Sequence, residues 1–199
     1  MRILIVADEP SRKIWDYFEP HMLDKYDLIL SAGDLPPHYL QFLVTMSHAP
    51  LYYVHGNHDT RYETDPPEGC VCIEDKIVNF HGLRILGLGG SMRYKPGTCM
   101  YTEKEMRKRV RRLWFPLLKN HGFDMLLTHA PAEGLNDSTD LPHHGFGIFR
   151  ELLDKYKPAY FVHGHMHKSY GGAYKKDDTY GETHVINGYV TYELEIPDK

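Results

Sequence analysis

Three histidines stand at every second position in the stretch FVHGHMHKS: His163, His165 and His167. In an extended segment, side chains two positions apart point to the same side. Neutral imidazole is among the commonest ligands of divalent transition metals, so one interpretation of this stretch is a metal site. The alternative is a polar strand edge that is wetted by solvent. The stretch alone leaves both interpretations open.

Further polar side chains stand where short apolar runs end. The runs lie in RILIVADE, DLILSAGD, LYYVHGNHD, FDMLLTHAP and AYFVHGHMH, and their content of Ile, Val, Leu and Tyr predicts strands that are buried on both faces. In an open α/β sheet, ligands collect beyond the carboxyl ends of the strands. Seven polar residues share that position: Asp8, Asp34, Asn57, His58, His129, His165 and His167.

These seven residues form a mixed oxygen and nitrogen donor set. Two carboxylates, one amide oxygen and several imidazoles suit Mn, Fe, Zn or Co better than Ca, which prefers oxygen alone, or Cu(I), which prefers sulfur. There are more candidate ligands than one ion usually takes. Two ions about 3.5–4 Å apart, bridged by a carboxylate, would use them all.

The elements that must position these residues alternate along much of the chain. Helices are expected at residues 14–17, 39–47, 103–115 and 149–156, between the predicted strands. Strand-like runs follow one another without helices at residues 76–87 and from residue 171 onward. This pattern predicts an α/β fold with two packed mixed β-sheets flanked by helices, in a single domain spanning residues 1–199.

The motifs together resemble those of the calcineurin-like metallophosphoesterases. That family carries D-x-H, G-D, G-N-H-[DE], a lone His after a strand, and G-H-x-H. The corresponding pieces here are ADEP, SAGDLP, GNHD, THAP and GHMH, in the same order between residues 8 and 167. The resemblance implies a four-layer sandwich with a dinuclear metal centre, manganese among the candidate ions.

The resemblance also implies a division of the ligands between two ions. Asp34 would be the bridging carboxylate. One metal site would be completed by Asn57, His129 and His165, and the other by Asp8 and His167. In this scheme His163 precedes the motif and is structural.

Two substrate contacts follow from the same resemblance, and a third comes from the sequence itself. His58 would face the phosphate and either stabilise developing charge or protonate the leaving oxygen, with Asn57 beside it. Asp59, next in the sequence, could orient the His58 ring. Arg93, in the Gly-rich stretch GLGGSMRYKPG, could bind a phosphate bidentately, or could be an ordinary surface arginine in a loop.

The chain departs from the family pattern at two positions. Pro10 stands where the family has a histidine, so the first metal site loses a donor and is expected to bind its ion more weakly. Glu9 is adjacent, but a strand would point it away from Asp8. Pro37 replaces a second aspartate typical of the Ser/Thr phosphatase branch, which favours the phosphodiesterase-like branch of the family.

The predicted function is hydrolysis of a phosphodiester, or of a monoester, by in-line attack of metal-bound water. The substrate would be a small phosphoester or a nucleotide. Two alternatives stay open on the same fold: a non-catalytic scaffold or binding protein, which Pro10 favours, and a nuclease. The nuclease interpretation rests on six basic residues between Lys104 and Arg112. However, an apolar stripe in the same segment predicts an ordinary amphipathic helix: Met106, Val110, Leu113 and Leu117.

Composition excludes several classes of protein. The 199 residues are 42% hydrophobic and 25% charged, which is typical of a globular domain rather than a disordered chain or a coiled coil. The net charge of -4 predicts no overall attraction to nucleic acid or to acidic membranes. Three cysteines, Cys70, Cys72 and Cys99, indicate reduced thiols rather than a disulfide framework. The N-terminal apolar run is too short for a signal peptide, so we expect a cytoplasmic protein without a membrane partner.

Overall fold

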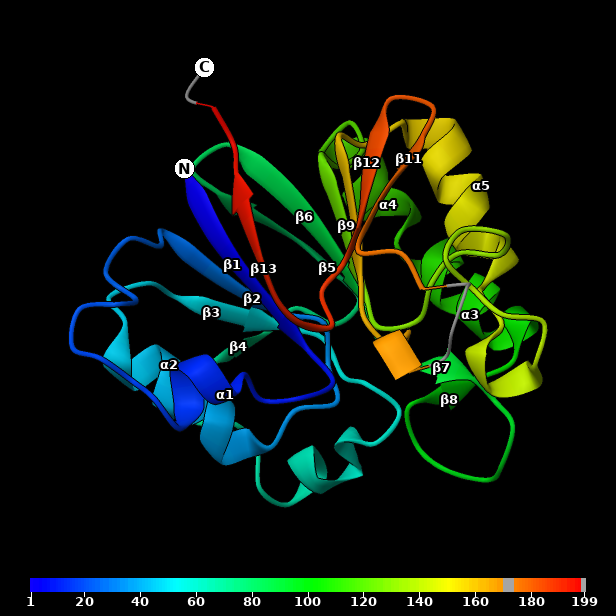
Figure 1. The fold of residues 1–199 in the computed structure, drawn as a ribbon. Coiled ribbons are helices and arrows are strands. Elements are labelled where there is room, and N and C mark those ends of the chain that lie inside the picture. Colours follow the sequence, from blue (N-terminus) through cyan, green and yellow to red (C-terminus); the bar gives the residue numbers. More distant parts are fainter. Residues whose placement is uncertain (170–173, 198–199) are drawn as a thin grey trace.

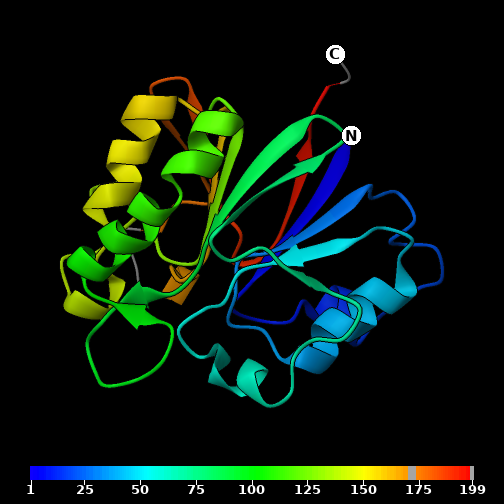
Figure 2. The same cartoon turned by 180° about the vertical axis from the view of Figure 1, so that it is seen from behind.

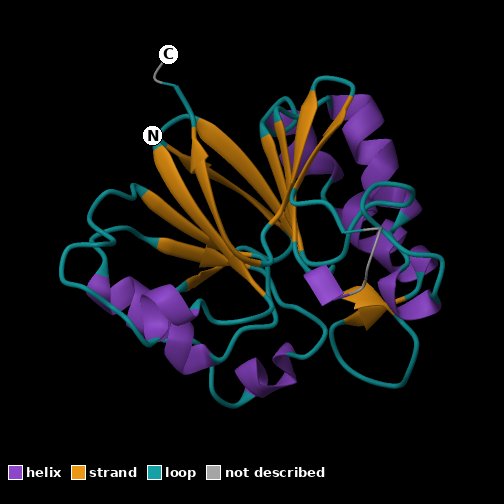
Figure 3. Ribbon diagram, in the orientation of Figure 1, coloured by secondary structure: helices purple, strands orange, loops and turns teal. Residues whose placement is uncertain are grey.

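Two β-sheets pack face to face, and helices cover the outer side of each sheet (Figures 1 and 3). The structure is a computed structural model that describes residues 1–169 and 174–197. The predicted α/β fold with two packed mixed sheets and flanking helices is confirmed. Of the strand-like segment expected from residue 171 onward, residues 171–173 and 198–199 lie outside the described residues.

The first sheet has the order β13-β1-β2-β3-β4. The strands β1 (Arg2–Ala7), β2 (Leu28–Ser31), β3 (Leu51–Tyr53) and β4 (Val71–Cys72) are parallel, and β13 (Val190–Glu195) joins β1 in antiparallel register, with Ile5 opposite Tyr192. Alternate residues of β1 enter different cores. Ile3 and Ile5 pack between the sheets, whereas Leu4 and Val6 face α1 (Arg12–Trp15) and α2 (Pro37–Met46) on the outer side.

The second sheet has the order β11-β12-β10-β9-β6-β5. Its inner strands β6 (Leu83–Leu88), β9 (Met125–Thr128), β10 (Tyr160–His163) and β12 (Thr183–Asn187) are parallel. The edges β5 (Lys76–Phe80) and β11 (Asp177–Tyr180) are antiparallel to their neighbours. Every residue of β2 and of β9 is buried, as predicted for strands that are covered on both faces.

Three helices cover the outer side of the second sheet, as Figure 2 shows from behind: α3 (Glu103–Arg112), α4 (Trp114–Lys119) and α5 (Gly147–Tyr156). Thr102 and Glu105 form a capping box that begins α3. The single helix expected at residues 103–115 is wrong at its end, because the chain breaks at Leu113 and α4 begins at the next residue. Pro116 has no N–H to donate to the carbonyl of Arg112, so one continuous helix cannot form.

The remaining helices begin two residues earlier than predicted: α1 at Arg12, α2 at Pro37 and α5 at Gly147. The predicted apolar stripe of α3 and α4 is confirmed, since Met106, Val110, Leu113 and Leu117 are all buried in the core beneath these helices. A short parallel pair, β7 (Ser91–Met92) and β8 (Met100–Tyr101), lies between β6 and α3 in the chain. Within the described residues, no helix is both long and apolar enough to cross a bilayer.

Candidate metal centre

Polar residues from both sheets meet where the parallel strands end. Asp34 and Asn57 follow β2 and β3 of the first sheet, and His129 and His165 follow β9 and β10 of the second. His129 Nε2 lies 3.3 Å from Asp34 Oδ2, 2.9 Å from Asn57 Oδ1 and 3.0 Å from His165 Nδ1. The position of the residues at strand ends therefore brings four of the seven predicted site residues into one group.

The outer nitrogen of each imidazole fixes which inner nitrogen faces the group. His129 Nδ1 donates to the carbonyl of Ala32 at 2.8 Å, and His165 Nε2 donates to the carbonyl of Pro142 at 2.7 Å. When both outer nitrogens carry protons, the inner nitrogens of the neutral rings present lone pairs. Two imidazole nitrogens, a carboxylate oxygen and an amide oxygen then face one another without a donor, an arrangement that favours a cation between them. These residues fit a divalent transition metal.

In the absence of an ion, a proton takes part of that role. Burial lowers the pKa of His129, but the adjacent charge of Asp34 outweighs it and raises the pKa to about 9. Burial, together with repulsion from His129, lowers the pKa of His165 to about 3. Burial raises the pKa of Asp34, yet the charge of His129 and its hydrogen bond prevail and bring it to about 2. The centre is thus arranged around one positive charge.

Three of the predicted ligands have a backbone conformation that L-residues rarely adopt. Asp8, Asp34 and His165 have φ angles of 68°, 58° and 66°. Asp59 supports this geometry, because its Oδ2 accepts from the N–H groups of Asp34 at 2.8 Å and Gly56 at 2.7 Å. A Cβ on Gly56 would lie 2.0 Å from Asp34 Oδ1, so only glycine permits this approach.

The predicted first metal site is less complete. His167 Nε2 lies 3.5 Å from Asp8 Oδ1, and both carboxylate oxygens of Asp8 accept from the His165 N–H at 3.0 Å. Among the described residues, Asp34, His129 and His165 form a group whose ligand atoms all lie within 4.8 Å of one another. Asp8 and His167 do not belong to this group. Glu9 does not fill the position that Pro10 leaves, since its carboxylate accepts from the Tyr189 hydroxyl at 2.7 Å.

His58 lies at the exposed side of the centre. Its N–H donates to Asp34 Oδ1 at 2.7 Å, and its side chain is exposed. Asp59 is buried and directs its Oδ2 to backbone N–H groups rather than to the His58 ring. Burial and the charge of Asp34 raise the pKa of Asp59 to about 6. The contacts of Asp59 therefore indicate that it positions the loops around His58 and Asp34.

The other histidine and arginine singled out in the sequence have partners of their own. His163 is fully buried; its Nδ1 donates to the carbonyl of Gly164 at 2.9 Å, and its Nε2 lies 3.3 Å from Asn136 Nδ2. Arg93 contacts the carbonyl of Met100 and pairs with Glu105 at 2.9 Å. These contacts engage the Arg93 guanidinium, and phosphate binding by Arg93 stays a prediction.

Two features of the site were not predicted. The ring of His143 lies 5.2 Å from that of His165, and His143 Nδ1 lies 2.5 Å from Asp140 Oδ2. The pair of histidines in LPHHGFG is the only local signal of this contact in the sequence around His143. The segment before α5 thus reaches the centre through both Pro142 and His143.

The second feature is a partly buried ionic network, centred on the buried Arg109, behind the loop that carries Asn57 and His58. Glu74 Oε1 accepts from the His55 N–H at 2.9 Å, and its Oε2 pairs with Arg109 of α3. Arg109 also binds Asp75 Oδ1 at 2.9 Å and the carbonyl of Gly89 at 2.8 Å. One of the basic residues that suggested nucleic-acid binding is therefore buried and structural.

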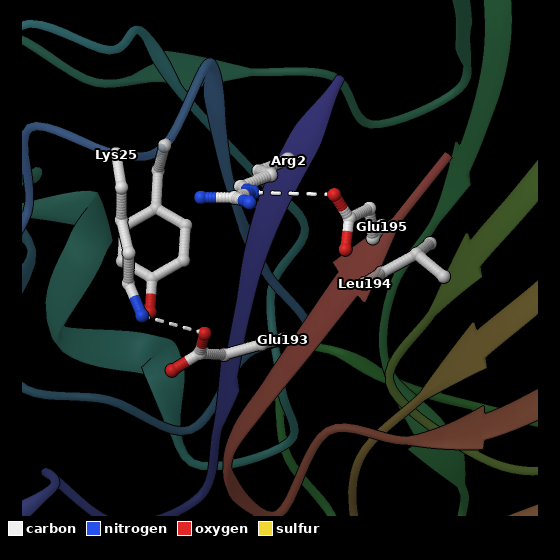
Figure 4. A pocket seen from close by; sticks show the side chains of 6 residues that line it. Arg2, Lys25, Glu193, Leu194 and Glu195 are labelled. Atoms are coloured by element: carbon white, nitrogen blue, oxygen red, sulfur yellow. Dashed lines mark hydrogen bonds and ion pairs between the residues drawn. The ribbon is translucent and has the colours of Figure 1, made fainter. Parts of the chain in front are cut away.

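Two surface hollows lie away from this centre. Figure 4 shows the one beside β1 and β13, where Lys25 pairs with Glu193 at 2.7 Å and Arg2 with Glu195 at 3.3 Å. The other is lined by residues near the amino ends of β6 and β10, including Leu83 and Tyr160. Neither includes a predicted site residue.

Solved structures share this arrangement of sheets and helices. The protein TT1561 of Thermus thermophilus matches with a TM-score of 0.62 at 15% identity, covering 94% of this chain and 88% of that one. Phosphopantetheinyl hydrolase of Mycobacterium tuberculosis matches with a TM-score of 0.62 at 12% identity, with the same coverage. An uncharacterized protein of Haemophilus influenzae is 26% identical over 200 residues, covering 84% of each chain.

The fold and the centre define an α/β protein with a candidate metal site at the carboxyl ends of parallel strands in two packed sheets. The model of the calcineurin-like phosphoesterases matches residues 1–169, and the chain belongs to that family. Membership confirms the predicted resemblance and indicates phosphoester hydrolysis with divalent metals.

Proposed function

We propose that this protein hydrolyses a phosphodiester of a small molecule or nucleotide, using divalent ions held at the candidate metal centre. The observation that carries the proposal is the convergence of acceptor atoms from Asp34, His129 and His165 within 4.8 Å, with Asn57 Oδ1 beside them. When bound, such ions supply a water of lowered pKa and positive charge beside the phosphoryl oxygens.

The complete site would be held by Asp34, Asn57, His129 and His165. Asp8 and His167 would hold a second ion together with Asp34, which would then serve both sites. Pro10 leaves the first metal site, that of Asp8 and His167, with one donor fewer. We therefore propose that this site binds its ion only at a higher metal concentration than the complete site does. The ions proposed are Mn, Fe, Zn or Co, in keeping with mixed nitrogen and oxygen donors.

His58 would act on the substrate rather than on the metal. Its backbone N–H is fixed on Asp34, so the ring is attached next to the centre while its side chain reaches solvent. A histidine in that position can donate a proton to the leaving oxygen, or a hydrogen bond to the phosphoryl group. Asn57 Nδ2 has no hydrogen-bond partner among the described residues and would donate to a phosphoryl oxygen.

The test is hydrolysis of bis-p-nitrophenyl phosphate by protein stripped with a chelator and reloaded with Mn²⁺, Zn²⁺, Co²⁺ or Fe²⁺. Asp34→Asn, which keeps the size of the side chain and removes its charge, is the matched variant. We expect metal-dependent turnover that is lost in Asp34→Asn. Absence of turnover with all four metals, together with tight metal binding, would instead favour the non-catalytic scaffold.

A further inference from the structure

A basic and apolar surface covers the outer side of α3 and α4. Its apolar part consists of Trp114, Phe115 and Leu118, which are 66%, 57% and 66% exposed. The neighbouring Leu113 and Leu117 are buried and attach α4 to the core. The exposed side chains are therefore not needed to hold this helix. Contiguous large apolar side chains on a surface mark a site of interaction.

The basic part lies on α3 and at the end of α4. Lys104, Lys108 and Arg111 are exposed at the i, i+4, i+7 spacing of one face of α3, and Phe115 and Leu118 are exposed on α4, which begins two residues after α3 ends. Arg112 and Lys119 are exposed as well. In the part of the chain that the structure describes, no ion pair involves any of these five basic residues.

Two other basic residues of α3 differ from these five. Arg107 pairs with Glu103 and Glu151, and Arg109 pairs with Glu74 and Asp75. Within the described residues, acidic partners thus neutralise Arg107 and Arg109, whereas the exposed basic residues of α3 have no ion-pair partner. The outer surface is cationic although the net charge of the chain is -4.

The chemistry of this surface selects among possible occupants. A second copy of the chain would bring the same uncompensated cations against each other, which is unfavourable. A single-stranded nucleic acid would stack its bases on ring faces, but Leu118, which is 66% exposed, offers it no ring face. An anionic bilayer offers negative headgroups for the basic residues and an apolar layer for Trp, Phe and Leu.

The place of α4 in the fold suits such docking. Arg84, at the beginning of β6, donates to the carbonyls of Asn120 and His121 just after α4 and pairs with Asp124 before β9. The end of α4 therefore lies at the amino ends of β6 and β9, whereas the metal centre lies at the carboxyl ends (Figure 1). A membrane at α4 would leave the centre open to the solvent.

We propose that α3 and α4 form a peripheral binding surface for anionic phospholipid membranes, with Trp114, Phe115 and Leu118 inserted at the interface and the exposed basic residues on the headgroups. This surface is an exception to the expectation, drawn from net charge alone, that the protein has no membrane partner.

The experiment is co-sedimentation of the full chain with vesicles of phosphatidylcholine alone or with 30% phosphatidylserine. Two double variants test the surface: Trp114→Ser with Phe115→Ser, and Lys108→Glu with Arg111→Glu. Lys13→Glu with Tyr17→Ser makes matched changes at exposed residues near α1. Hydrolysis of bis-p-nitrophenyl phosphate by each variant reports whether it folds, since none of these residues belongs to the centre.

We expect the protein to bind vesicles with phosphatidylserine at least tenfold more strongly than neutral ones, and each surface variant to lose that binding at unchanged hydrolysis. Brominated acyl chains should quench tryptophan fluorescence, and Trp114→Phe, which leaves Trp15, should abolish the quenching. Equal binding to both vesicles, or binding unchanged in the surface variants, would overturn the proposal. Absence of vesicle binding would overturn it as well. In that case, loss of a dimer in the surface variants would indicate a second copy of the chain as the partner, and loss of oligonucleotide binding would indicate a nucleic acid.

Discussion

At the scale of single residues, the centre depends on which atom of each side chain carries a proton. The carbonyls of Ala32 and Pro142 each accept from one imidazole nitrogen and so direct the other nitrogen of His129 and His165 inward. His58 differs from both, because its backbone N–H, rather than its ring, contacts Asp34. The two proposed ligands and the proposed proton donor thus differ in their contacts although all three are histidines.

Substitution of His58 tests that distinction. His58→Ala should keep the metal content of the protein, while turnover falls by about 10²–10⁴-fold because a positioned proton donor is lost. The measurement combines metal analysis with kcat for bis-p-nitrophenyl phosphate, and His129→Ala serves as the contrast that should lose metal. Loss of metal in His58→Ala would mean that His58 is a ligand.

Metal affinity should depend on pH through His129. The metal-free protein holds a proton on His129 up to a pKa of about 9, and a metal can bind only after that proton leaves. Affinity should therefore rise by up to tenfold per pH unit from pH 7 to about 9. Calorimetric titrations in two buffers of different ionisation enthalpy should show release of about one proton at pH 7. Affinity that is constant over this range would contradict the assignment.

The same proton affects the stability of the metal-free fold. The pKa of His129 is raised above 6.5 in the folded state. The contribution of its protonation to the free energy of unfolding is therefore complete below pH 6.5 and disappears as the pH rises through about 9.

At the scale of elements, α3 is linked to the loop that presents Asn57 and His58. Arg109 of α3 binds Glu74, and Glu74 binds the backbone of His55. The ring of Tyr101 lies 4.5 Å from the Arg109 guanidinium, so the ion pair is enclosed on that side too. The helix that resembled a nucleic-acid-binding element therefore supports the geometry of the site.

Removal of one member of this network should be costly. Arg109→Met should lower the free energy of unfolding by about 3 kcal/mol, because Glu74 then keeps only His55, whose Nδ1 lies 3.4 Å from Glu74 Oε1, as its counter-charge. Arg107→Met, which removes a more exposed pair on the same helix, should cost only about 1 kcal/mol. Urea denaturation of both variants measures the difference. Equal losses would show that the Arg109 network is no more important than a surface ion pair.

The network also shows where prediction from sequence ends. Asp34, His129 and His165 could be placed together because each follows a buried parallel strand, and such strands end at one edge. Arg109 and Glu74 could not, because they are 35 positions apart on elements whose packing no local pattern encodes. The break at Leu113 had a visible cause in Pro116, but the uninterrupted stripe from Met106 to Leu117 concealed it.

At the scale of the whole molecule, the candidate centre joins two sheets. Asp34 belongs to the first sheet, and His129 and His165 belong to the second. An ion shared among them would bind only the folded protein, since the unfolded chain does not bring these residues together. The metal is therefore expected to stabilise the packing of the sheets as well as to serve catalysis.

Removal of metal should accordingly lower the melting temperature. At a free metal concentration of about 100 times Kd, the ion adds about 2.7 kcal/mol to stability. For a chain of this length, that corresponds to roughly 5–10 °C. Differential scanning calorimetry with and without chelator measures the shift, and Asp34→Asn should show a much smaller one. Identical melting of the wild-type protein with and without metal would mean that the sheets are not linked through the centre.

The pairing of β1 with β13 constrains how this protein can be made. Residues 2–7 pair with residues 190–195, so one edge of β1 stays without its partner until almost all of the described chain has left the ribosome. Asp8, directly after that strand, also contacts late residues of the chain, His165 and His167. During synthesis the nascent chain exposes an apolar strand edge, which is a substrate for chaperones and a site of aggregation. A chaperone that holds the first strand until β13 has been made should therefore raise the yield of folded protein more than added metal does.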